Sequence, residues 1–419
     1  MMKVIVIGAG AAGMFAAIWA ARSGHSVVCL EKNEKAGKKL FITGKGRCNL
    51  TNACDNEELF DSIIENPKFM YSALRKFDNK NTIEFFNNLG LKTKIERGNR
   101  VFPESDHSSD VIKVLEEEMK RLGVRLFFNT LVQSITTKID EEGKEVFSSV
   151  KTKKGNIEAD AVIIATGGVS YPVTGSTGDG HKFAKSLGHK IIPVFPSLVP
   201  VILMGGEPKE LEGLSLKNVN VAVTDEKKGG KELYSKQGEM LFTRNGVSGP
   251  LILTLTSVIG RKVSEGGLKL HIDLKPALDE KKLDERVLRD FEEEKNKNLE
   301  NAMGGLLPQR LINVVIKRTG IDAAKKVNSI SKQEREKIVS VLKDLDFDIT
   351  GYGTLNEAII TRGGVSIKEI NPSTMESKKV KNVYFAGEVM DVDAVTGGFN
   401  LQIAWSTAFT AATSIGKTQ

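Results

Sequence analysis

The sequence predicts an α/β protein in which a Rossmann-like domain is split between the two ends of the chain and interrupted by a small antiparallel β domain that carries a helical module. Three observations predict this arrangement. An apolar strand near the N-terminus runs into a glycine-rich turn and an alanine-rich helix, and an apolar strand near the C-terminus ends in a Gly-Glu pair. Between them the pattern changes to short alternating strands and then to charged helices. Strand-helix-strand units build parallel sheets, whereas runs of short alternating strands indicate antiparallel structure.

The first strand and its turn carry the most informative motif. Residues 3–7 are mainly apolar, and Gly8, Gly10 and Gly13 follow in G-x-G-x-x-G spacing before a helix that stops at Gly24. In this context the first glycine allows a sharp turn, the second lets the backbone approach a pyrophosphate, and the third lets the helix pack closely on the sheet. The motif therefore predicts a dinucleotide site, with the phosphates at the N-terminus of the helix.

A second strand, residues 26–30, ends in Glu31. An acidic side chain at this position accepts hydrogen bonds from ribose hydroxyls. It would repel a 2′-phosphate, so NADP is disfavoured at this site.

The segment that follows the second strand is rich in glycine and basic residues. It contains Gly44, Gly46 and Arg47 within residues 37–52. Backbone amides and an arginine are natural partners for anions, so this segment is suited to wrapping the pyrophosphate and the ring end of an extended cofactor. The alternative interpretation is an ordinary polar loop.

Two further apolar strands end in small residues. Residues 159–164 run into Ala165, Thr166 and Gly167, and residues 382–386 run into Gly387 and Glu388. Ligands of open α/β sheets bind at the carboxyl ends of the strands. Gly397 and Gly398 then precede a helix through Ala412, whose N-terminus is a second site suited to an anion or a carbonyl group.

We expect three structural domains. Residues 1–193 and 373–419 form the nucleotide domain, residues 194–275 and 346–372 the inserted antiparallel β domain, and residues 276–345 the helical module. Ser331 and Glu334 have the spacing of a capping box. Ser108 or Ser109 is expected to cap an earlier helix.

Composition limits the class of protein. The chain has 419 residues, of which 40% are hydrophobic, and it contains no apolar run near the ~20 residues needed to span a bilayer. Three cysteines argue against a disulfide framework, so we expect a cytoplasmic protein. The net charge of +7 permits a nucleic acid partner, but Lys and Glu are interspersed, and we expect a small-molecule substrate. None of the five histidines has metal-ligand spacing, so no metal is predicted.

These motifs together resemble a known family. The glycine fingerprint with Glu31, the stretch from Gly37 to Asn52, the segment from Ser170 to Gly180 and the segment from Gly387 to Ala404 resemble the BaiN-type or YhiN-type flavoproteins. Members are described as NAD(P)/FAD-dependent oxidoreductases or aminoacetone-oxidase-like proteins, and they are related to glutathione reductase. The resemblance covers essentially the whole chain. It implies an FAD domain split between the termini, an inserted β-barrel-like domain, and a helical module inserted in that domain.

The resemblance also implies roles for individual residues. Glu31 would bind the adenosine ribose, with Lys32 and Lys39 near the phosphate or ribose end, and Val132 would meet adenine through its backbone. The flavin's pyrimidine edge would lie at Gly398, Phe399, Asn400 and Leu401. The remaining cofactor contacts would be Gly8, Gly10, Ala11, Ala12, Gly13, Ala165, Thr166, Gly167, Gly387 and Glu388. This sequence has Lys45 where the family usually has glycine, so either the turn differs or no positive φ is needed there.

Several functions follow from a bound flavin. The first is hydride transfer between flavin N5 and an organic substrate, with NADH or NADPH as a transient donor, since no second dinucleotide motif is present. We expect Arg47, Tyr171 and Arg362 to anchor the substrate, although the two arginines could equally hold cofactor or domain contacts. The alternatives are a flavoprotein that binds or modifies RNA, and a flavin-linked reductase with Cys48 and Cys54 as its dithiol.

Overall fold

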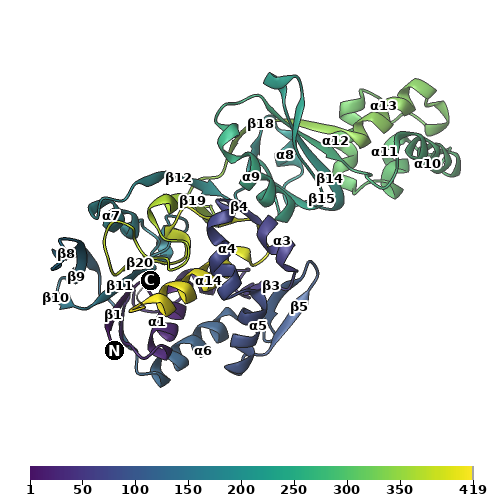
Figure 1. The fold of residues 1–419 in the computed structure, drawn as a ribbon. Helices are drawn as coiled ribbons and strands as arrows, with labels where there is room; N and C mark the ends of the chain where they lie inside the picture. The colour runs from purple at the N-terminus through teal and green to yellow at the C-terminus, as the bar shows by residue number, and fades with distance from the viewer. Residues whose placement is uncertain (418–419) are drawn as a thin grey trace. The chain divides into compact units, whose positions relative to one another are not determined.

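The computed structural model describes residues 1–417, which form two compact units. Unit 1 comprises Met1–Ser197 and Thr354–Gln419, and unit 2 comprises Leu198–Gly353. Each unit has its own hydrophobic core, and Figure 1 shows the course of the chain through both units. The chain therefore leaves unit 1 once, builds unit 2 and returns to complete unit 1.

Unit 1 is built on a parallel sheet of five strands in the order β20-β11-β1-β2-β7. The register pairs Ile7 of β1 with Leu30 of β2 on one side and Ile164 of β11 on the other, and Ile164 with Phe385 of β20. The strands are β1 (Lys3–Ile7), β2 (Ser26–Leu30), β7 (Arg125–Phe127), β11 (Ala161–Ile164) and β20 (Val383–Phe385). The C-terminal strand thus joins the sheet of the N-terminal strands, as the sequence predicted.

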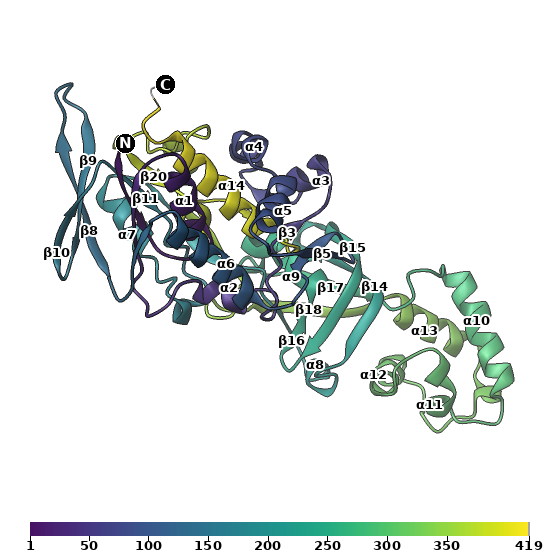
Figure 2. The ribbon, with the colours of Figure 1, turned by 90° about the horizontal axis from the view of Figure 1, so that it is seen from below.

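Helices α1 (Ala11–Arg22) and α14 (Phe399–Ser414) pack against each other, and they lie side by side in Figures 1 and 2. Most residues of both helices are buried, which is typical of helices surrounded by protein. A cluster of aromatic rings fills the space between them and α5; it includes Phe15, Phe85 and Trp405. The two ends of the chain are therefore joined by one core.

Shorter elements surround this centre. The helices are α2 (Lys38–Ile42), α3 (Asn56–Asp61), α4 (Pro67–Lys76), α5 (Asn79–Asn88), α6 (Ser108–Arg121) and α7 (Asp179–Ser186), with 3-10 turns η1 (Pro172–Thr174), η5 (Ile367–Glu369) and η6 (Gly387–Val389). Small sheets are formed by β3 (Thr51–Asn52), β6 (Arg100–Pro103) and β5 (Thr93–Glu96), and by β8 (Val132–Ile139), β9 (Glu145–Thr152) and β10 (Gly155–Glu158). Two strand pairs complete the unit, β12 (Ile191–Ser197) with β19 (Ile360–Val365), and β4 (Ile63–Glu65) with β21 (Asp393–Ala394).

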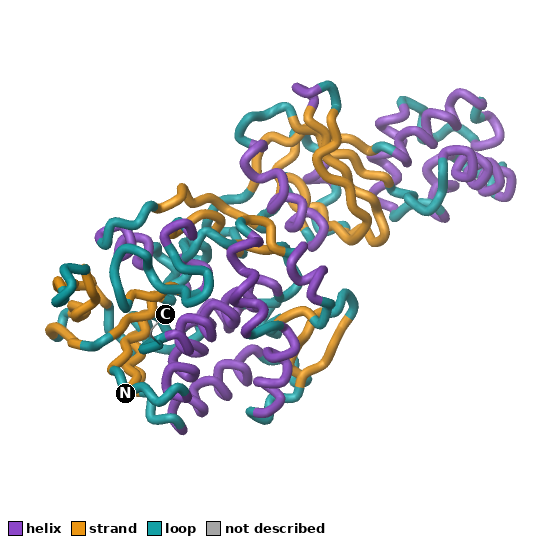
Figure 3. The backbone as a smooth tube through the Cα atoms, in the orientation of Figure 1, coloured by secondary structure: helices purple, strands orange, loops and turns teal. Residues whose placement is uncertain are grey.

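Unit 2 is a closed barrel with the strand order β13-β16-β15-β14-β17-β18. Its strands are β13 (Val201–Leu203), β14 (Ser215–Asp225), β15 (Lys231–Thr243), β16 (Gly246–Ser248), β17 (Leu268–Asp273) and β18 (Leu345–Tyr352), accompanied by α8 (Glu207–Glu210), α9 (Pro250–Val263) and η2 (Glu226–Lys228). Between β17 and β18 the chain forms a group of helices that Figure 3 shows in purple: α10 (Glu280–Glu293), α11 (Leu299–Ala302), α12 (Gln309–Thr319) and α13 (Lys332–Lys343), with η3 (Met303–Gly305) and η4 (Val327–Ser329). The helical module is an insertion within the barrel.

The unit boundaries differ from the expected domain boundaries mainly at the second junction. The expected β domain includes residues 346–372, but residues from Thr354 onward belong to unit 1. The reason is that β19 pairs with β12, with Val365 opposite Ile191 and Thr361 opposite Pro196. The three-domain division itself stays a prediction.

The two predicted caps have different outcomes. Ser331 accepts a hydrogen bond from the Glu334 N–H, and the Glu334 side chain accepts one from the Ser331 N–H, so the capping box is confirmed. The prediction that Ser108 or Ser109 caps the helix is wrong, because His107 is the N-cap residue and no side-chain hydrogen bond caps this helix. The buried Ser108 hydroxyl instead donates to the carbonyl of Phe41 at 2.6 Å.

Over residues 1–417, no helix has the length and apolar character that crossing a membrane requires. In the same part of the chain, no group of three or more His, Cys, Asp or Glu side chains is arranged to hold a metal ion.

Candidate functional site

The glycine turn after β1 meets the geometric demands of its motif. Gly8 has φ +99°, and a Cβ there would lie 2.7 Å from the carbonyl oxygen of Ala165. A Cβ on Gly13 would lie 1.8 Å from the carbonyl oxygen of Gly8. A Cβ on Gly10 would meet no protein atom within 4 Å. Gly8 and Gly13 are thus required by the fold itself, whereas the space beside Gly10 is open on the side where the motif predicts a phosphate.

Glu31 lies at the end of β2 and is 7% exposed. One carboxylate oxygen accepts from the Ala9 N–H at 2.8 Å, and the other accepts from the backbone and side-chain N–H groups of Asn33, both at 2.8 Å. A carboxylate has about four acceptor positions, so these three bonds leave about one. Glu31 braces the glycine turn and keeps capacity for one further donor, such as a ribose hydroxyl.

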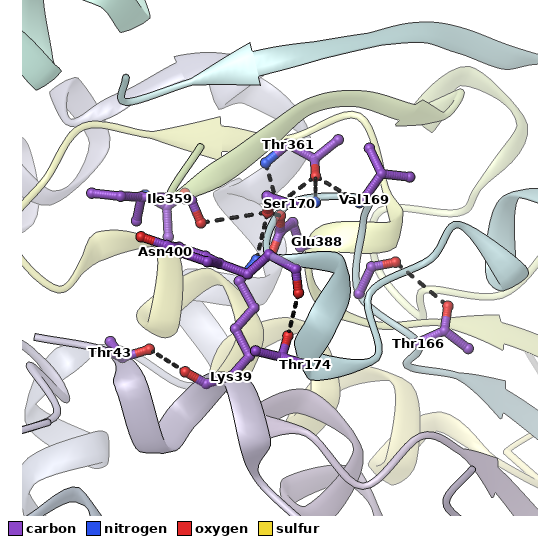
Figure 4. A network of polar contacts seen from close by, with 12 residues as sticks. Lys39, Thr43, Thr166, Val169, Ser170, Thr174, Ile359, Thr361, Glu388 and Asn400 are labelled. Carbon is purple, nitrogen blue, oxygen red and sulfur yellow. Dashed lines mark hydrogen bonds and ion pairs between the residues drawn. The ribbon is translucent and has the colours of Figure 1, made fainter. Parts of the chain in front are cut away.

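A polar network draws four segments of unit 1 together at Glu388 (Figure 4). Its Oε2 accepts from Lys39 Nζ of α2 at 2.6 Å, and its Oε1 accepts from Ser170 Oγ at 2.7 Å and from the Thr361 N–H of β19 at 2.8 Å. Lys39 also donates to Ser170 Oγ at 2.6 Å. The Lys39 and Glu388 side chains are 23% and 17% exposed, so this ion pair is partly shielded from water.

Thr361 completes this network from the other side. Its hydroxyl oxygen accepts from the N–H groups of Val169 and Ser170 at 2.8 and 3.0 Å. These bonds fix the loop that follows β11, because they hold its backbone rather than a side chain. Sequence reasoning missed the joint role of Ser170 and Thr361, since 191 positions separate them and no local pattern links them.

The glycine-rich segment after α2 adopts left-handed backbone at successive residues. Gly44, Lys45 and Gly46 have φ of +62°, +59° and +83°. The position where this sequence departs from the family pattern therefore does use a positive φ, and Lys45 adopts it with the strain that a Cβ brings.

Arg47 lies beside acidic residues. Its guanidinium donates to Asp106 from Nε at 2.8 Å and to Glu96 from Nη2 at 2.5 Å, and it lies 4.2 Å from the centre of the Phe102 ring. These hydrogen bonds raise the pKa of Arg47, and its bond to Glu96 lowers the pKa of that carboxyl. Arg47 therefore stabilises the segment, with its charge compensated by two carboxylates.

Arg362, the other arginine predicted to anchor a substrate, is buried in β19. It binds Asp393 with Nε at 3.0 Å and Nη2 at 2.9 Å, and the two side chains are 5% and 1% exposed. Ser197 donates to the same carboxylate at 3.0 Å. Burial raises the pKa of Asp393, and the neighbouring Arg362 opposes that shift.

Tyr171, the third substrate candidate, has φ +49°, an uncommon conformation for an aromatic residue. The backbone is held on both sides, because Ser170 belongs to the Glu388 network and the Tyr171 carbonyl accepts from the N–H and hydroxyl of Thr174 at 2.8 and 2.7 Å. The side chain is half-buried. Lys32, which was expected near the cofactor, donates to Asp179 at 2.6 Å and to Thr177 at 2.5 Å.

The other predicted cofactor residues line the same edge of the sheet. The Ala165 N–H donates to the Ile7 carbonyl, which holds residues 165–167 against the glycine turn. Gly387 has φ +74°, and a Cβ there would lie 2.9 Å from that of Ala12. Val132, in contrast, is a buried residue of β8.

Helix α14 starts at the end of a left-handed turn formed by Gly397 and Gly398, and no side-chain hydrogen bond caps it. Asn400 in its first turn binds the preceding loop, because its Oδ1 accepts from the Ala394 N–H at 2.9 Å and its Nδ2 donates to the Ala394 carbonyl at 2.8 Å. The first N–H groups of a helix have no partner within the helix, so this start is suited to a carbonyl or an anion.

Cys48 and Cys54 are free, buried thiols. Burial raises the pKa of Cys54 to about 11, and it also raises the pKa of Cys48. A redox dithiol reacts through its thiolate, which these environments disfavour. The geometry therefore gives the dithiol alternative no support.

Comparison with known proteins identifies a family whose sequence model matches this chain, and relatives that align with it over nearly its whole length. The model of the HI0933-like protein Rossmann domain matches residues 2–414. A 3-dehydro-bile acid delta(4,6)-reductase from Clostridium scindens is 30% identical over 414 residues, which are 98% of each chain. A ribosomal RNA dihydrouridine synthase from Haemophilus influenzae is 30% identical over 413 residues, 99% of this chain and 98% of that one.

Among solved structures, a 3-ketosteroid delta1-dehydrogenase from Sterolibacterium denitrificans matches with a TM-score of 0.52 and 12% identity, and the match covers 98% of both chains. At this identity the likeness concerns the fold, and it agrees with the Rossmann-like α/β architecture expected from the sequence. The expectation of an oxidoreductase is confirmed by the reductase relative, which matches over almost its whole length. The chain belongs to the HI0933-like family of Rossmann-fold proteins, the BaiN-type and YhiN-type proteins whose motifs it carries.

Proposed function

We propose that this protein is an FAD-dependent oxidoreductase that reduces a carbon–carbon double bond conjugated to a carbonyl group in an organic substrate. The proposal rests on three features that unit 1 brings together. They are the open space beside the Gly10 backbone, the carboxylate of Glu31 and the start of α14, which no side chain caps. An extended dinucleotide needs such partners at its phosphates, its ribose and its ring.

The residues fit FAD at both ends. The N–H groups at the start of α1 would meet the pyrophosphate, and Glu31 would take a hydroxyl of the adenosine ribose. Lys39, which the family resemblance implies near the phosphate or ribose end, already donates to Glu388. It would therefore act by holding that carboxylate in place. The segment from Gly44 to Arg47 and the residues Gly398, Phe399, Asn400 and Leu401 would surround the ring.

The substrate class comes from what the names of two relatives have in common. Reduction of a bile acid at its delta(4,6) positions and formation of dihydrouridine both convert a carbon–carbon double bond into a single bond. FAD, once bound and reduced by the proposed nicotinamide donor, would supply a hydride from N5 for such a step. One carbon of the double bond would gain that hydride and the other a proton.

A small organic substrate is favoured over RNA. Phosphate contacts by lysine and arginine supply much of the affinity of proteins for nucleic acid. The cationic side chains expected near the cofactor are all paired with carboxylates, namely Lys32 with Asp179, Lys39 with Glu388, Arg47 with Glu96 and Asp106, and Arg362 with Asp393. RNA remains the second candidate, because of the dihydrouridine synthase relative and the net charge of +7.

The first experiment is an absorbance spectrum of the purified protein, followed by anaerobic mixing with NADH or NADPH. We expect a flavin spectrum that bleaches on mixing, since we propose a nicotinamide as the transient donor. A protein that binds no flavin even with added FAD would reject the proposed function. A bound flavin that neither nucleotide reduces would reject the nicotinamide donor alone.

The substrate class is tested with the reduced protein. A steroid with a conjugated enone should reoxidise the flavin in the absence of oxygen, and its saturated analogue should not. Retention of ribosomal RNA that weakens steeply with salt, together with dihydrouridine in the recovered RNA, would instead favour the second candidate.

A further inference from the structure

The buried amide of Gln402 joins three parts of unit 1. Gln402 lies one turn into α14 and is 0% exposed. Its Oε1 accepts from Thr51 Oγ1 of β3 at 2.7 Å and from Thr82 Oγ1 of α5 at 2.8 Å. Its Nε2 donates to Ser406 Oγ at 2.9 Å and to the Phe77 carbonyl at 3.3 Å. Both amide hydrogens and both oxygen lone pairs thus have partners, which fixes the orientation of the group.

The bond from Thr51 differs from the bond from Thr82. The Thr82 hydroxyl also lies 3.1 Å from the Asp78 carbonyl, so its single hydrogen is shared between two acceptors. Gln402 is the one hydrogen-bond acceptor that the structure gives for the Thr51 hydroxyl within residues 1–417. Thr51 is therefore oriented by Gln402.

Other contacts hold the same two segments together. The Trp405 Nε1–H donates to the Leu50 carbonyl at 2.9 Å, and the Asn52 side chain donates to the Gly397 carbonyl at 3.1 Å. A Cβ on Gly398 would lie 2.4 Å from the Thr51 carbonyl oxygen, so the start of α14 touches the backbone of this strand. The end of the glycine-rich segment and the helix start consequently form one rigid element.

We propose that Gln402 is a positioning residue for the ring end of the cofactor site. It has no access to a ligand itself, and it acts through Thr51, which sets where the segment 50–52 lies against the start of α14. This inference rests on the proposed function, because those two elements are the ones assigned to the flavin ring. Loss of the Thr51 bond should let residues 50–52 shift against the start of α14, while the hydrogen bonds of Trp405 and Asn52 keep the two segments together.

Two matched variants test the proposal in the full-length protein. Thr51→Val and Thr82→Val each remove one hydroxyl that donates to the same oxygen, and both threonines are 0% exposed. We expect T51V to raise the dissociation constant of FAD at least fivefold and to shift the midpoint potential of the bound flavin. We expect a smaller change in T82V, at most about twofold in the dissociation constant, because the Thr82 hydroxyl shares its hydrogen with the Asp78 carbonyl. Thermal unfolding of both variants checks that their losses of stability are similar.

A purely structural role predicts a different pattern. FAD affinity would then follow stability equally in T51V and T82V, and that result would overturn the proposal. Gln402→Leu should weaken FAD binding more than tenfold if it folds; if it does not fold, the two threonine variants decide. If the wild-type protein binds no FAD, the proposed function is rejected and this inference falls with it. If the wild type binds FAD and T51V binds it with the same affinity, only the inference is rejected.

Discussion

Lys45 has a left-handed backbone conformation, which is unfavourable for a residue with a Cβ atom. Its φ of +59° lies in the left-handed region, where a Cβ costs about 1–2 kcal/mol. Glycine would remove that strain, but it also raises the conformational entropy of the unfolded chain. This second effect offsets about 0.4–1 kcal/mol of the stabilisation. We predict that Lys45→Gly raises the free energy of unfolding by about 0.5–1 kcal/mol in urea titrations. Lys153→Gly is the control, since this exposed lysine has no positive φ and should gain nothing.

The Lys39–Glu388 ion pair allows a second test at the residue scale. Lys39→Met leaves a partly shielded carboxylate without its cation, and we expect a loss of about 1–2 kcal/mol in the free energy of unfolding. Lys38→Met is the matched control on the same helix, because Lys38 pairs with the exposed Glu34 four residues earlier and should cost under about 0.5 kcal/mol. Equal losses in the two variants would mean that the Glu388 network contributes no more than a surface pair.

At the scale of elements, the start of α14 is the feature with a direct electronic consequence. The positive end of a helix favours negative charge nearby, so it should ease reduction of a flavin bound there. Gly398→Ala would place a Cβ 2.4 Å from the Thr51 carbonyl oxygen at a φ of +102° and disrupt this start. We predict a more negative midpoint potential. Gly416→Ala is the control beyond the other end of the same helix, where φ is +72° and the nearest atom is the Met2 sulfur. An unchanged potential in G398A would reject the role of the helix.

Helix α13 provides a prediction about pH. The hydrogen bond from Lys325 at 2.7 Å, with that from the Ser331 N–H, lowers the pKa of Glu334 to about 2. Because the folded pKa is depressed, the stabilisation is present above the unfolded value near 4.5 and is lost as pH falls toward 2. Glu334→Gln keeps the capping box but removes the charge. The protection factors of the α13 amides, which compare their exchange rates with those of unprotected amides at the same pH, should therefore fall between pH 4.5 and pH 2 in the wild type, and less so in E334Q.

At the scale of the whole molecule, the two cores are separate. The core of unit 1 contains residues up to Leu187 and from Val365 onward, and that of unit 2 lies within Val201–Ile349. Strands β12 and β19 pair up to Ser197 and Ile360, so a short linker can replace unit 2. We predict that a chain with residues 198–353 replaced by a Gly-Ser linker keeps unit 1 folded and binds FAD. Failure to fold would show that unit 1 depends on the insertion.

The sequence by itself determined features that depend on neighbouring residues. The glycine spacing after β1, the acid that ends β2, the capping box at Ser331 and the alternating strands of the barrel are set by local backbone geometry and by hydrophobic period, both of which can be read along the chain. The same reasoning could not foresee that β19 pairs with β12, because several partners are compatible with one short apolar strand.

Only the tertiary structure decided the partners of the charged and polar side chains. Lys39 and Glu388 are hydrogen-bonded although 349 positions separate them in the sequence, and 351 positions separate the hydrogen-bonded pair Thr51 and Gln402. Whether a lysine faces a phosphate or a carboxylate of its own chain depends on which segments the topology brings together. The sequence therefore predicted a dinucleotide site at the sheet edge, while the fold decided that the lysines and arginines expected there pair with carboxylates of the chain itself.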